Sequence, residues 1–160
     1  MSIQAGDRLP DIALTVAGPN GPRTAPIAEL FGGKRTALFA VPGAFTPTCS
    51  AKHLPGFKAL AGELKAKGID QIACVSVNDA FVMAAWAKDQ GITDEVLMLA
   101  DSSGDFTRAL GLEGDFSKFG LGSRSQRYSM LVNDGVVEQL NVEAPGEYRV
   151  SSAEFLVEQL

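Results

Sequence analysis

Residues 36–41 (Thr-Ala-Leu-Phe-Ala-Val) constrain the fold most, because five of these six consecutive residues are apolar. A strand with one face in water alternates apolar and polar side chains, whereas a strand covered on both faces is apolar throughout. Residues 72–75 and 96–100 are similar apolar runs. The chain therefore predicts a sheet whose central strands are buried on both sides.

Amphipathic and turn-forming segments separate these apolar runs. We expect strands at residues 12–16, 36–41, within 69–77, 96–100, 127–132 and 136–140. We expect helices at 26–30, at 50–67 with an interruption at Pro55-Gly56, at 80–90, 104–110 and 151–160, and a glycine-rich loop at 111–122. The last two strands flank Asn133-Asp134-Gly135, a hairpin turn that accepts positive φ. This order predicts a single α/β domain over residues 1–160, with a central mixed β-sheet flanked by helices.

Charge and composition exclude several classes of partner. The net charge is −5 and the chain has no basic run, which argues against nucleic acid. Its first residues show no targeting pattern and no apolar run approaches membrane-spanning length, so no membrane partner is expected. Two cysteines are too few for a disulfide scaffold, and one histidine leaves too few ligands for a metal site. We therefore expect a reducing, cytoplasmic location and neither a metal nor another cofactor.

Cys49 is the candidate nucleophile. A Pro/Thr-rich loop follows the apolar run 36–41, and Cys49 then opens a predicted helix at the carboxyl end of a central strand. Unpaired N–H groups and the helix dipole both favour the reactive thiolate there. Thr46 can bring a hydroxyl that donates and accepts to the sulfur or to a bound oxygen. Pro42 and Pro47 would shield the thiolate, although loop rigidity alone could explain both prolines.

Two arginines could supply the cation that a thiolate and a departing oxygen need. Arg124 and Arg127 stand at the entry to the first hairpin strand. Residues three apart in a strand point to opposite faces, so at most one should face the site unless the strand begins between them. A solvated surface charge is the alternative for either residue.

His53 and Cys74 have less certain roles. His53 lies four residues after Cys49 on the same helical face. A Cys–His dyad or a metal site is disfavoured, and we expect His53 to orient an arginine or a loop. Cys74 is either a resolving thiol or a small apolar core residue, as free cysteines usually are. A disulfide between Cys49 and Cys74 would require local unfolding of the Cys49 helix.

Residues 42–57, PGAFTPTCSAKHLPGF, resemble the active-site segment of peroxiredoxins, and most resemble the peroxiredoxin-5 or plant type II branch. The resemblance extends over essentially the whole chain and implies a thioredoxin fold with N-terminal additions. It implies that Cys49 is the peroxidatic cysteine, which becomes a sulfenic acid. It also implies that Thr46 positions the peroxide, that Pro42 shields the sulfur and that Arg127 holds thiolate and peroxide together. The N–H groups of Thr48 and Cys49 would add donors.

The resemblance also implies substrates and partners. Hydrogen peroxide and alkyl hydroperoxides are the expected substrates. Residues 147–152 lack the resolving cysteine of animal peroxiredoxin-5, so the resemblance favours glutaredoxin with glutathione as reductant over thioredoxin. It further implies a homodimer through the active-site face, burying several exposed aromatic rings. The candidate rings are Phe45, Phe81, Trp86, Phe116 and Phe119.

Two other functions are compatible with a reactive cysteine. A peroxide-sensing redox switch shares the first chemical step with a peroxidase, so the sequence leaves it open. A disulfide oxidoreductase is disfavoured, because Thr46 and Lys52, three residues from Cys49, leave no C-x-x-C motif.

Overall fold

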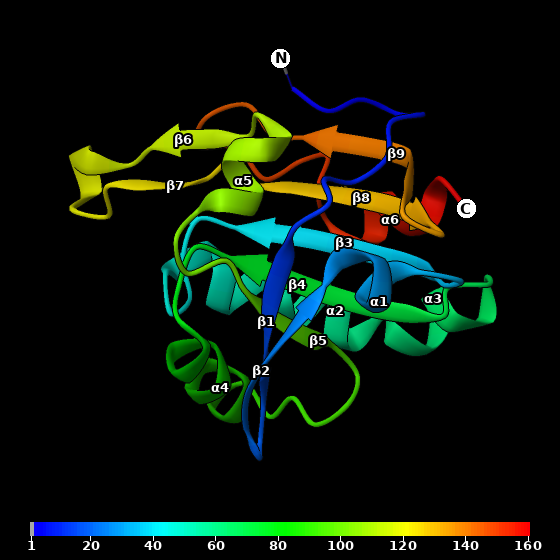
Figure 1. Ribbon diagram of the computed structural model, residues 1–160, viewed down its shortest axis with the longest axis horizontal. Coiled ribbons are helices and arrows are strands. Elements are labelled where there is room, and N and C mark those ends of the chain that lie inside the picture. The colour runs from blue at the N-terminus through cyan, green and yellow to red at the C-terminus, as the bar shows by residue number, and fades with distance from the viewer. Residues whose placement is uncertain (1) are drawn as a thin grey trace.

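The computed structural model describes residues 2–160 and contains one large mixed sheet with helices on both faces (Figure 1). The strands of this sheet are β1 (Ala13–Gly18), β2 (Gly21–Pro26), β3 (Arg35–Val41), β4 (Gln71–Ser76), β5 (Leu97–Ala100), β8 (Tyr128–Asn133) and β9 (Val136–Val142). The short strands β6 (Glu113–Asp115) and β7 (Ser123–Ser125) form a separate hairpin. The helices are α1 (Ile27–Phe31), the π-helix η1 (Cys49–His53), α2 (Leu54–Ala59), α3 (Ala61–Ala66), α4 (Ala80–Asp89), α5 (Asp105–Leu110), the 3₁₀-helix η2 (Ser117–Phe119) and α6 (Ala153–Glu158).

The large sheet has the strand order β2-β1-β5-β4-β3-β8-β9. Its centre is parallel, since β4 pairs in parallel with both β3 and β5. The flanking pairs β1–β2, β1–β5, β3–β8 and β8–β9 are antiparallel. The predicted α/β architecture with a central mixed sheet is confirmed.

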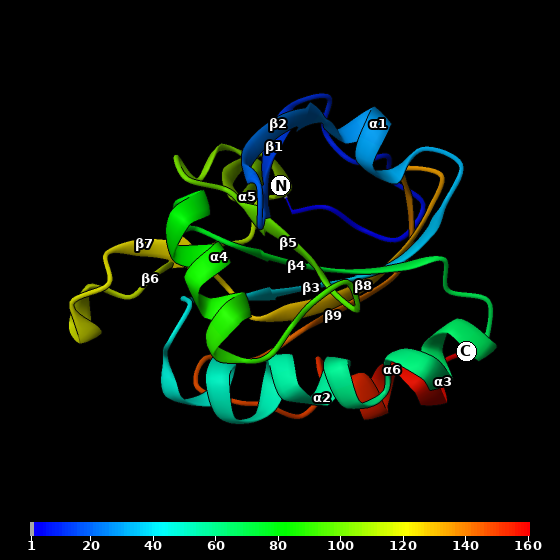
Figure 2. The same cartoon turned by 90° about the horizontal axis from the view of Figure 1, so that it is seen from below.

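The central strand β3 shows why this sheet needs two covering layers. Phe39 and its alternate neighbours pack into one apolar cluster with α2, α3, α4 and α6. Leu38 and Ala40 pack into a second cluster with α1 and α5. Figure 2 shows α2, α3 and α6 on one side of the sheet and α1 and α5 on the other. Burying both faces of a strand favours apolar residues at successive positions, as at residues 37–41 of this run.

Strand β2 was not expected from the sequence. Its residues, GPRTAP, are mostly exposed and contain two prolines, so they carry no apolar alternation. The strand lies at the edge of the sheet and forms by pairing with β1 from Ala13↔Pro26 to Gly18↔Gly21. Proline and polar residues are tolerated at a sheet edge, which hides such a strand from a pattern search.

The helix expected at residues 50–67 consists of three pieces, and the expected interruption at Pro55-Gly56 is wrong. Pro55 lies in the first turn of α2, where its missing N–H costs little. The π-helix η1 ends at His53, and the Leu54 N–H donates to the Cys49 carbonyl. The later break falls at Leu60, which has φ −98° and ψ 11° and separates α2 from α3.

Residues 111–122 are more ordered than the expected loop. Strands β6 and β7 pair antiparallel from Glu113↔Ser125 to Asp115↔Ser123, and η2 stands between them. Figure 1 shows this hairpin projecting from the body of the molecule. Strands of three residues are too short to leave a recognisable period in a glycine-rich sequence.

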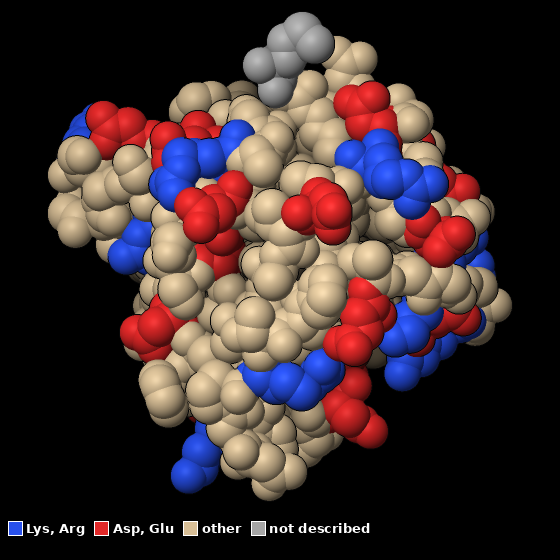
Figure 3. Space-filling view, in the orientation of Figure 1, with Lys and Arg blue, Asp and Glu red and all other residues tan. Residues whose placement is uncertain are grey.

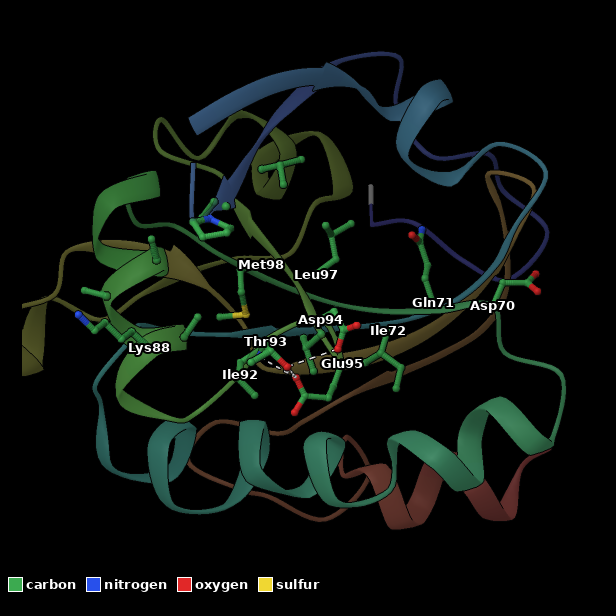
Figure 4. A pocket seen from close by; sticks show the side chains of 18 of the residues that line it. Asp70, Gln71, Ile72, Lys88, Ile92, Thr93, Asp94, Glu95, Leu97 and Met98 are labelled. Atoms are coloured by element: carbon green, nitrogen blue, oxygen red, sulfur yellow. Dashed lines mark hydrogen bonds between the residues drawn. The ribbon is translucent and has the colours of Figure 1, made fainter. Parts of the chain in front are cut away.

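The surface carries charges of both signs. Figure 3 shows acidic and basic side chains interleaved on one face. Among residues 2–160, no helix has the length and apolar character needed to cross a membrane. A cavity of about 950 Å³ lies along α4 and the start of β5, with Ile72, Ile92 and Met98 among its lining residues (Figure 4). None of the predicted site residues lines it.

Candidate active site

Cys49 lies where the chain leaves the carboxyl end of β3. The loop after Val41 leads into a helical turn that begins at Pro47, and Cys49 follows in η1. Its side chain is fully buried. Within residues 2–160, no backbone carbonyl accepts a hydrogen bond from the N–H groups of Thr48 or Cys49. The start of this helix therefore offers two free donors beside a buried thiol.

Arg127 is the cation that meets Cys49. Its Nη2 donates to Cys49 Sγ at 3.2 Å. A guanidinium at this distance can donate a charge-assisted hydrogen bond to a thiolate.

Arg124 does not touch the sulfur. Its Nε donates to the Leu121 carbonyl at 3.0 Å, and its Nη1 donates to the Pro42 carbonyl at 3.4 Å. Arg124 lies in β7, whereas Arg127 stands just before β8, so a new strand begins between them. Both arginines can therefore reach the Cys49 loop, one binding its backbone and the other its thiol.

His53 contacts both Arg127 and the Ser151 carbonyl. Its Nε2 lies 2.8 Å from the Ser151 carbonyl, which can only accept, so this nitrogen carries the proton. Nδ1 therefore has a lone pair, and it accepts from Arg127 Nη1 at 2.9 Å. Burial, assisted by the charge of Arg127, lowers the pKa of His53 to about 3, against the opposing effect of the Ser151 hydrogen bond. His53 is thus neutral near pH 7, and its only lone pair is already occupied.

Two side chains, those of Arg124 and Asn78, hold the loop between Val41 and Cys49 by hydrogen bonds to its backbone. Asn78 Oδ1 accepts from the N–H of Ala44 at 2.9 Å, next to Phe45, whose φ is +66°. The next residue, Asp79, caps α4 by accepting from Val82 N–H. Asn78 supports a loop 34 residues away, a contact that no local sequence pattern indicates.

Thr46 contacts its own loop rather than the sulfur. Its hydroxyl donates to the Gly43 carbonyl at 2.7 Å, which uses the hydroxyl proton. Across the described part of the chain, no hydrogen bond joins Thr46 to Cys49. The Thr46 oxygen keeps its lone pairs and can accept a hydrogen bond from a bound hydroperoxide.

A cavity of about 630 Å³ opens onto this site. Pro42, Thr48 and Arg127 line it at the Cys49 end. Phe116 and Phe119 from the β6–β7 hairpin contribute to its lining, together with residues that follow β9. Cys49 itself is fully buried and does not line the cavity, but its neighbour Thr48 and its hydrogen-bond partner Arg127 do.

Cys74 lies in the same apolar cluster as Cys49, but in the middle of β4 opposite Phe39. It is fully buried and not in a disulfide. Burial raises the pKa of the Cys74 thiol, the nearby Cys49 raises it further, and Arg127 opposes the rise in part. A thiol in this setting resembles a core residue.

The expected set of exposed aromatics needs two corrections. Phe45, Phe81 and Phe119 are exposed, whereas Phe116 is half-buried and Trp86 is fully buried. Trp86 lies on α4 with its ring in the core beneath the sheet, and its indole N–H donates to Ser50 Oγ at 3.0 Å. Helix α4 buries Met83 and Trp86, three residues apart, and exposes Phe81.

Comparison with known proteins shows the family of the chain. A family model described as Redoxin matches residues 4–156. The chain is 55% identical to Peroxiredoxin-2E, chloroplastic, from Arabidopsis thaliana, over 99% of this chain and 70% of that protein. It is 48% identical to Peroxiredoxin-2B of the same plant, over 99% and 98% of the two chains. The chain belongs to the peroxiredoxin family.

A solved structure agrees with this family membership and with the fold. The structure of reduced Prx3 from Vibrio vulnificus in complex with hydrogen peroxide superposes with a TM-score of 0.93, at 55% identity and 98% coverage of both chains. This peroxiredoxin therefore has the thioredoxin-like fold of its family and belongs to the type II branch. It is a thiol peroxidase that reduces peroxides.

Proposed function

We propose that Cys49 is the peroxidatic cysteine of this peroxidase. The observation that carries the proposal is the buried Cys49 Sγ, 3.2 Å from Nη2 of Arg127, a residue that lines the adjacent cavity. The thiolate attacks one peroxide oxygen, an S–O bond forms, and the O–O bond breaks. The electron pair of that bond leaves with the distal oxygen, which takes a proton to become water or an alcohol. Cys49 is left as a sulfenic acid.

The neighbouring groups have distinct roles in this step. Arg127 stabilises the thiolate and the charge that develops on the leaving oxygen. The N–H groups of Thr48 and Cys49 are fixed donors for the peroxide oxygens, and Thr46 accepts from the hydroperoxide proton. Pro42 limits the access of water to the sulfur. His53 and Arg124 position Arg127 and the loop, respectively.

An external thiol regenerates Cys49 in this scheme. A thiol attacks the sulfenic acid, releasing water and forming a mixed disulfide, and a second thiol then releases Cys49 as a thiolate. We favour glutaredoxin with glutathione over thioredoxin, since residues 147–152 hold no cysteine. The burial of Cys74 supports a core role for it, although opening of η1 would expose it as a resolving thiol.

We further propose that residues 1–160 act as one domain and that the protein is a cytoplasmic homodimer. One sheet collects strands from residues 13 to 142, which supports the single domain. Two free cysteines are compatible with a reducing compartment. Exposed Phe45, Phe81 and Phe119 are candidates for burial between two copies. Light scattering at micromolar concentration tests the dimer, and a monomer would contradict it.

Stopped-flow oxidation by hydrogen peroxide tests the central assignment. Wild type should consume one equivalent of peroxide rapidly, and Cys49→Ser should show no reaction on that timescale. Adding glutathione with glutaredoxin, or thioredoxin with its reductase, then shows which thiol sustains turnover. Turnover with either system separates an enzyme from a sensor that reacts only once. Rapid oxidation of Cys49→Ser would refute the role of Cys49.

A further inference from the structure

A buried carboxylate, Glu143, stands behind the active site without a cationic partner. Glu143 follows β9 directly and is only 6% exposed. Within residues 2–160, no lysine or arginine forms an ion pair with it. Burying a charge without a counter-ion is costly unless hydrogen bonds compensate. The position of this carboxylate therefore needs an explanation.

Four hydrogen bonds converge on one oxygen of this carboxylate. Glu143 Oε2 accepts from the N–H groups of Arg149, Val150 and Ser151 at 2.8, 2.9 and 2.8 Å. It also accepts from the Ser151 hydroxyl at 2.6 Å. Burial raises the pKa of Glu143, but these hydrogen bonds outweigh burial and leave the pKa below its usual value. The group is thus ionised near pH 7, and it fixes the backbone of residues 149–151.

The fixed segment continues toward the thiol. The Ser151 carbonyl accepts from His53 Nε2 at 2.8 Å, His53 Nδ1 accepts from Arg127 Nη1 at 2.9 Å, and Arg127 Nη2 reaches Cys49 Sγ. Glu143 also holds Arg127 through the backbone, since the Glu143 N–H donates to the Arg127 carbonyl at 2.9 Å. Both the main chain and the guanidinium of Arg127 are therefore tied to Glu143.

We propose that Glu143 is a positioning residue for the peroxidatic centre, acting through Ser151 and His53 to aim the Arg127 guanidinium at Cys49. By placing the Ser151 carbonyl against the His53 ring, the carboxylate selects the tautomer whose Nδ1 faces Arg127. A hydrogen bond at Nδ1 then leaves Arg127 Nη2 directed at the sulfur. This inference rests on the proposed roles of Cys49 and Arg127.

A simpler role for Glu143 would be to stabilise the turn at residues 143–151 and nothing more. In that case Glu143→Ala would lower the melting temperature but leave the folded protein with the reactivity of wild type. If Glu143 acts through Arg127, its removal slows the reaction of Cys49 with peroxide in the folded protein. The loss must then disappear once Arg127 is absent.

A double-mutant cycle on the full chain distinguishes the two roles. The second-order rate constant of Cys49 with hydrogen peroxide is measured in wild type, Glu143→Ala, Arg127→Ala and the double variant. Since a small misplacement of a catalytic group is costly, we expect Glu143→Ala to slow the reaction by about ten- to a hundredfold. In the Arg127→Ala background it should change the rate less than about threefold. Equal losses in both backgrounds, or no loss in either, would overturn the proposal.

Matched variants distinguish a change in the reactivity of Cys49 from a general folding defect. Glu138 lies on β9 and pairs with Arg35 far from the site, so Glu138→Ala should react like wild type. Glu143→Gln keeps an acceptor oxygen without the charge, and we expect a loss of roughly three- to tenfold, smaller than for alanine. If Glu143→Ala does not fold, the cycle is run with Glu143→Gln, and an unchanged rate in that variant would refute the proposal. If Arg127→Ala reacts like wild type, the role of Arg127 itself fails, a result distinct from failure of Glu143 alone.

Discussion

The two cysteines of this chain have the same burial and different chemistry. Cys49 and Cys74 are both fully buried, both free, and members of one apolar cluster. Cys49 lies at the start of a helix and contacts the Arg127 guanidinium. Cys74 lies within a paired strand, and no charged group among residues 2–160 donates a hydrogen bond to it. Burial alone disfavours a thiolate. The comparison shows that fixed donors and a cation, rather than exposure, make one of the two thiols suited to catalysis.

Chemical labelling should separate the two thiols most strongly. We expect iodoacetamide at pH 7 to alkylate Cys49 at least about 100-fold faster than Cys74, because the thiolate is the reactive form and the Arg127 guanidinium contacts Cys49 Sγ. The neighbouring residue Thr48 lines a cavity, whereas Cys74 lies within a central strand of the sheet. Peptide mass spectrometry over time measures both rates. Labelling of Cys74 first, or at an equal rate, would contradict the comparison.

Removing the Arg127 guanidinium should lower the reactivity of the Cys49 thiol toward that of Cys74. Arg127→Ala should slow oxidation by hydrogen peroxide on the order of 100-fold, the usual loss for a donor that acts in the transition state. Arg127→Lys restores the charge but lacks the fork that reaches both Cys49 Sγ and His53 Nδ1, so it should recover only part of the rate. Stopped-flow kinetics of the folded variants measure this loss. Full activity in Arg127→Ala would remove the basis of the comparison.

The free energy of unfolding of the protein should depend on pH through His53, the one histidine of the chain. Its pKa is about 3 in the folded protein and about 6.5 when unfolded, so below pH 6.5 the unfolded chain binds a proton that the folded protein does not. Stability from this residue is therefore present above pH 6.5 and falls as the pH drops toward 3. We expect a loss of about 2 kcal/mol between pH 7 and pH 5.

Urea unfolding at pH 7 and pH 5 measures this loss. His53→Gln cannot titrate in this range, so its stability should depend less on pH than that of wild type. Glutamine can still donate to the Ser151 carbonyl, which makes it a closer match than alanine. An equal pH dependence in both proteins would show that His53 is not the group responsible.

Changing Cys74 should have the smallest effect. With glutaredoxin and glutathione as reductant, we expect Cys74→Ser to retain peroxidase activity within about threefold of wild type, since Cys74 donates nothing to the reaction of Cys49 with peroxide. The buried serine hydroxyl should cost about 1–3 kcal/mol of stability, so Cys74→Ala serves as a second variant. Steady-state turnover is the measurement. Complete loss in both folded variants would mean that Cys74 resolves the sulfenic acid.

Local patterns predicted the main framework of the fold. The apolar run at residues 36–41 became the central strand β3, and the Asn133-Asp134-Gly135 turn joined β8 to β9 as expected. The edge strand β2 and the β6–β7 hairpin were missed, because exposed or three-residue strands leave no period of their own. Trp86 was misplaced because its neighbours along the chain do not reveal which face of α4 is buried.

The sequence by itself determined that this chain forms a two-sided α/β sheet and carries Cys49 on the loop-to-helix turn after its central strand. Those features depend on neighbouring residues, whose hydrophobicity and backbone preferences act locally. Only the tertiary structure decided that Arg127 rather than Arg124 contacts the sulfur of Cys49 and that His53 Nδ1 accepts a hydrogen bond from Arg127. It also decided that Glu143 binds the backbone of Ser151, which contacts His53. His53 contacts Arg127 and Ser151, which lie 74 and 98 positions away, and Arg127 contacts Cys49 across 78 positions. Hydrogen bonds between distant segments form only once the sheet has brought those segments together, so no local pattern contains them.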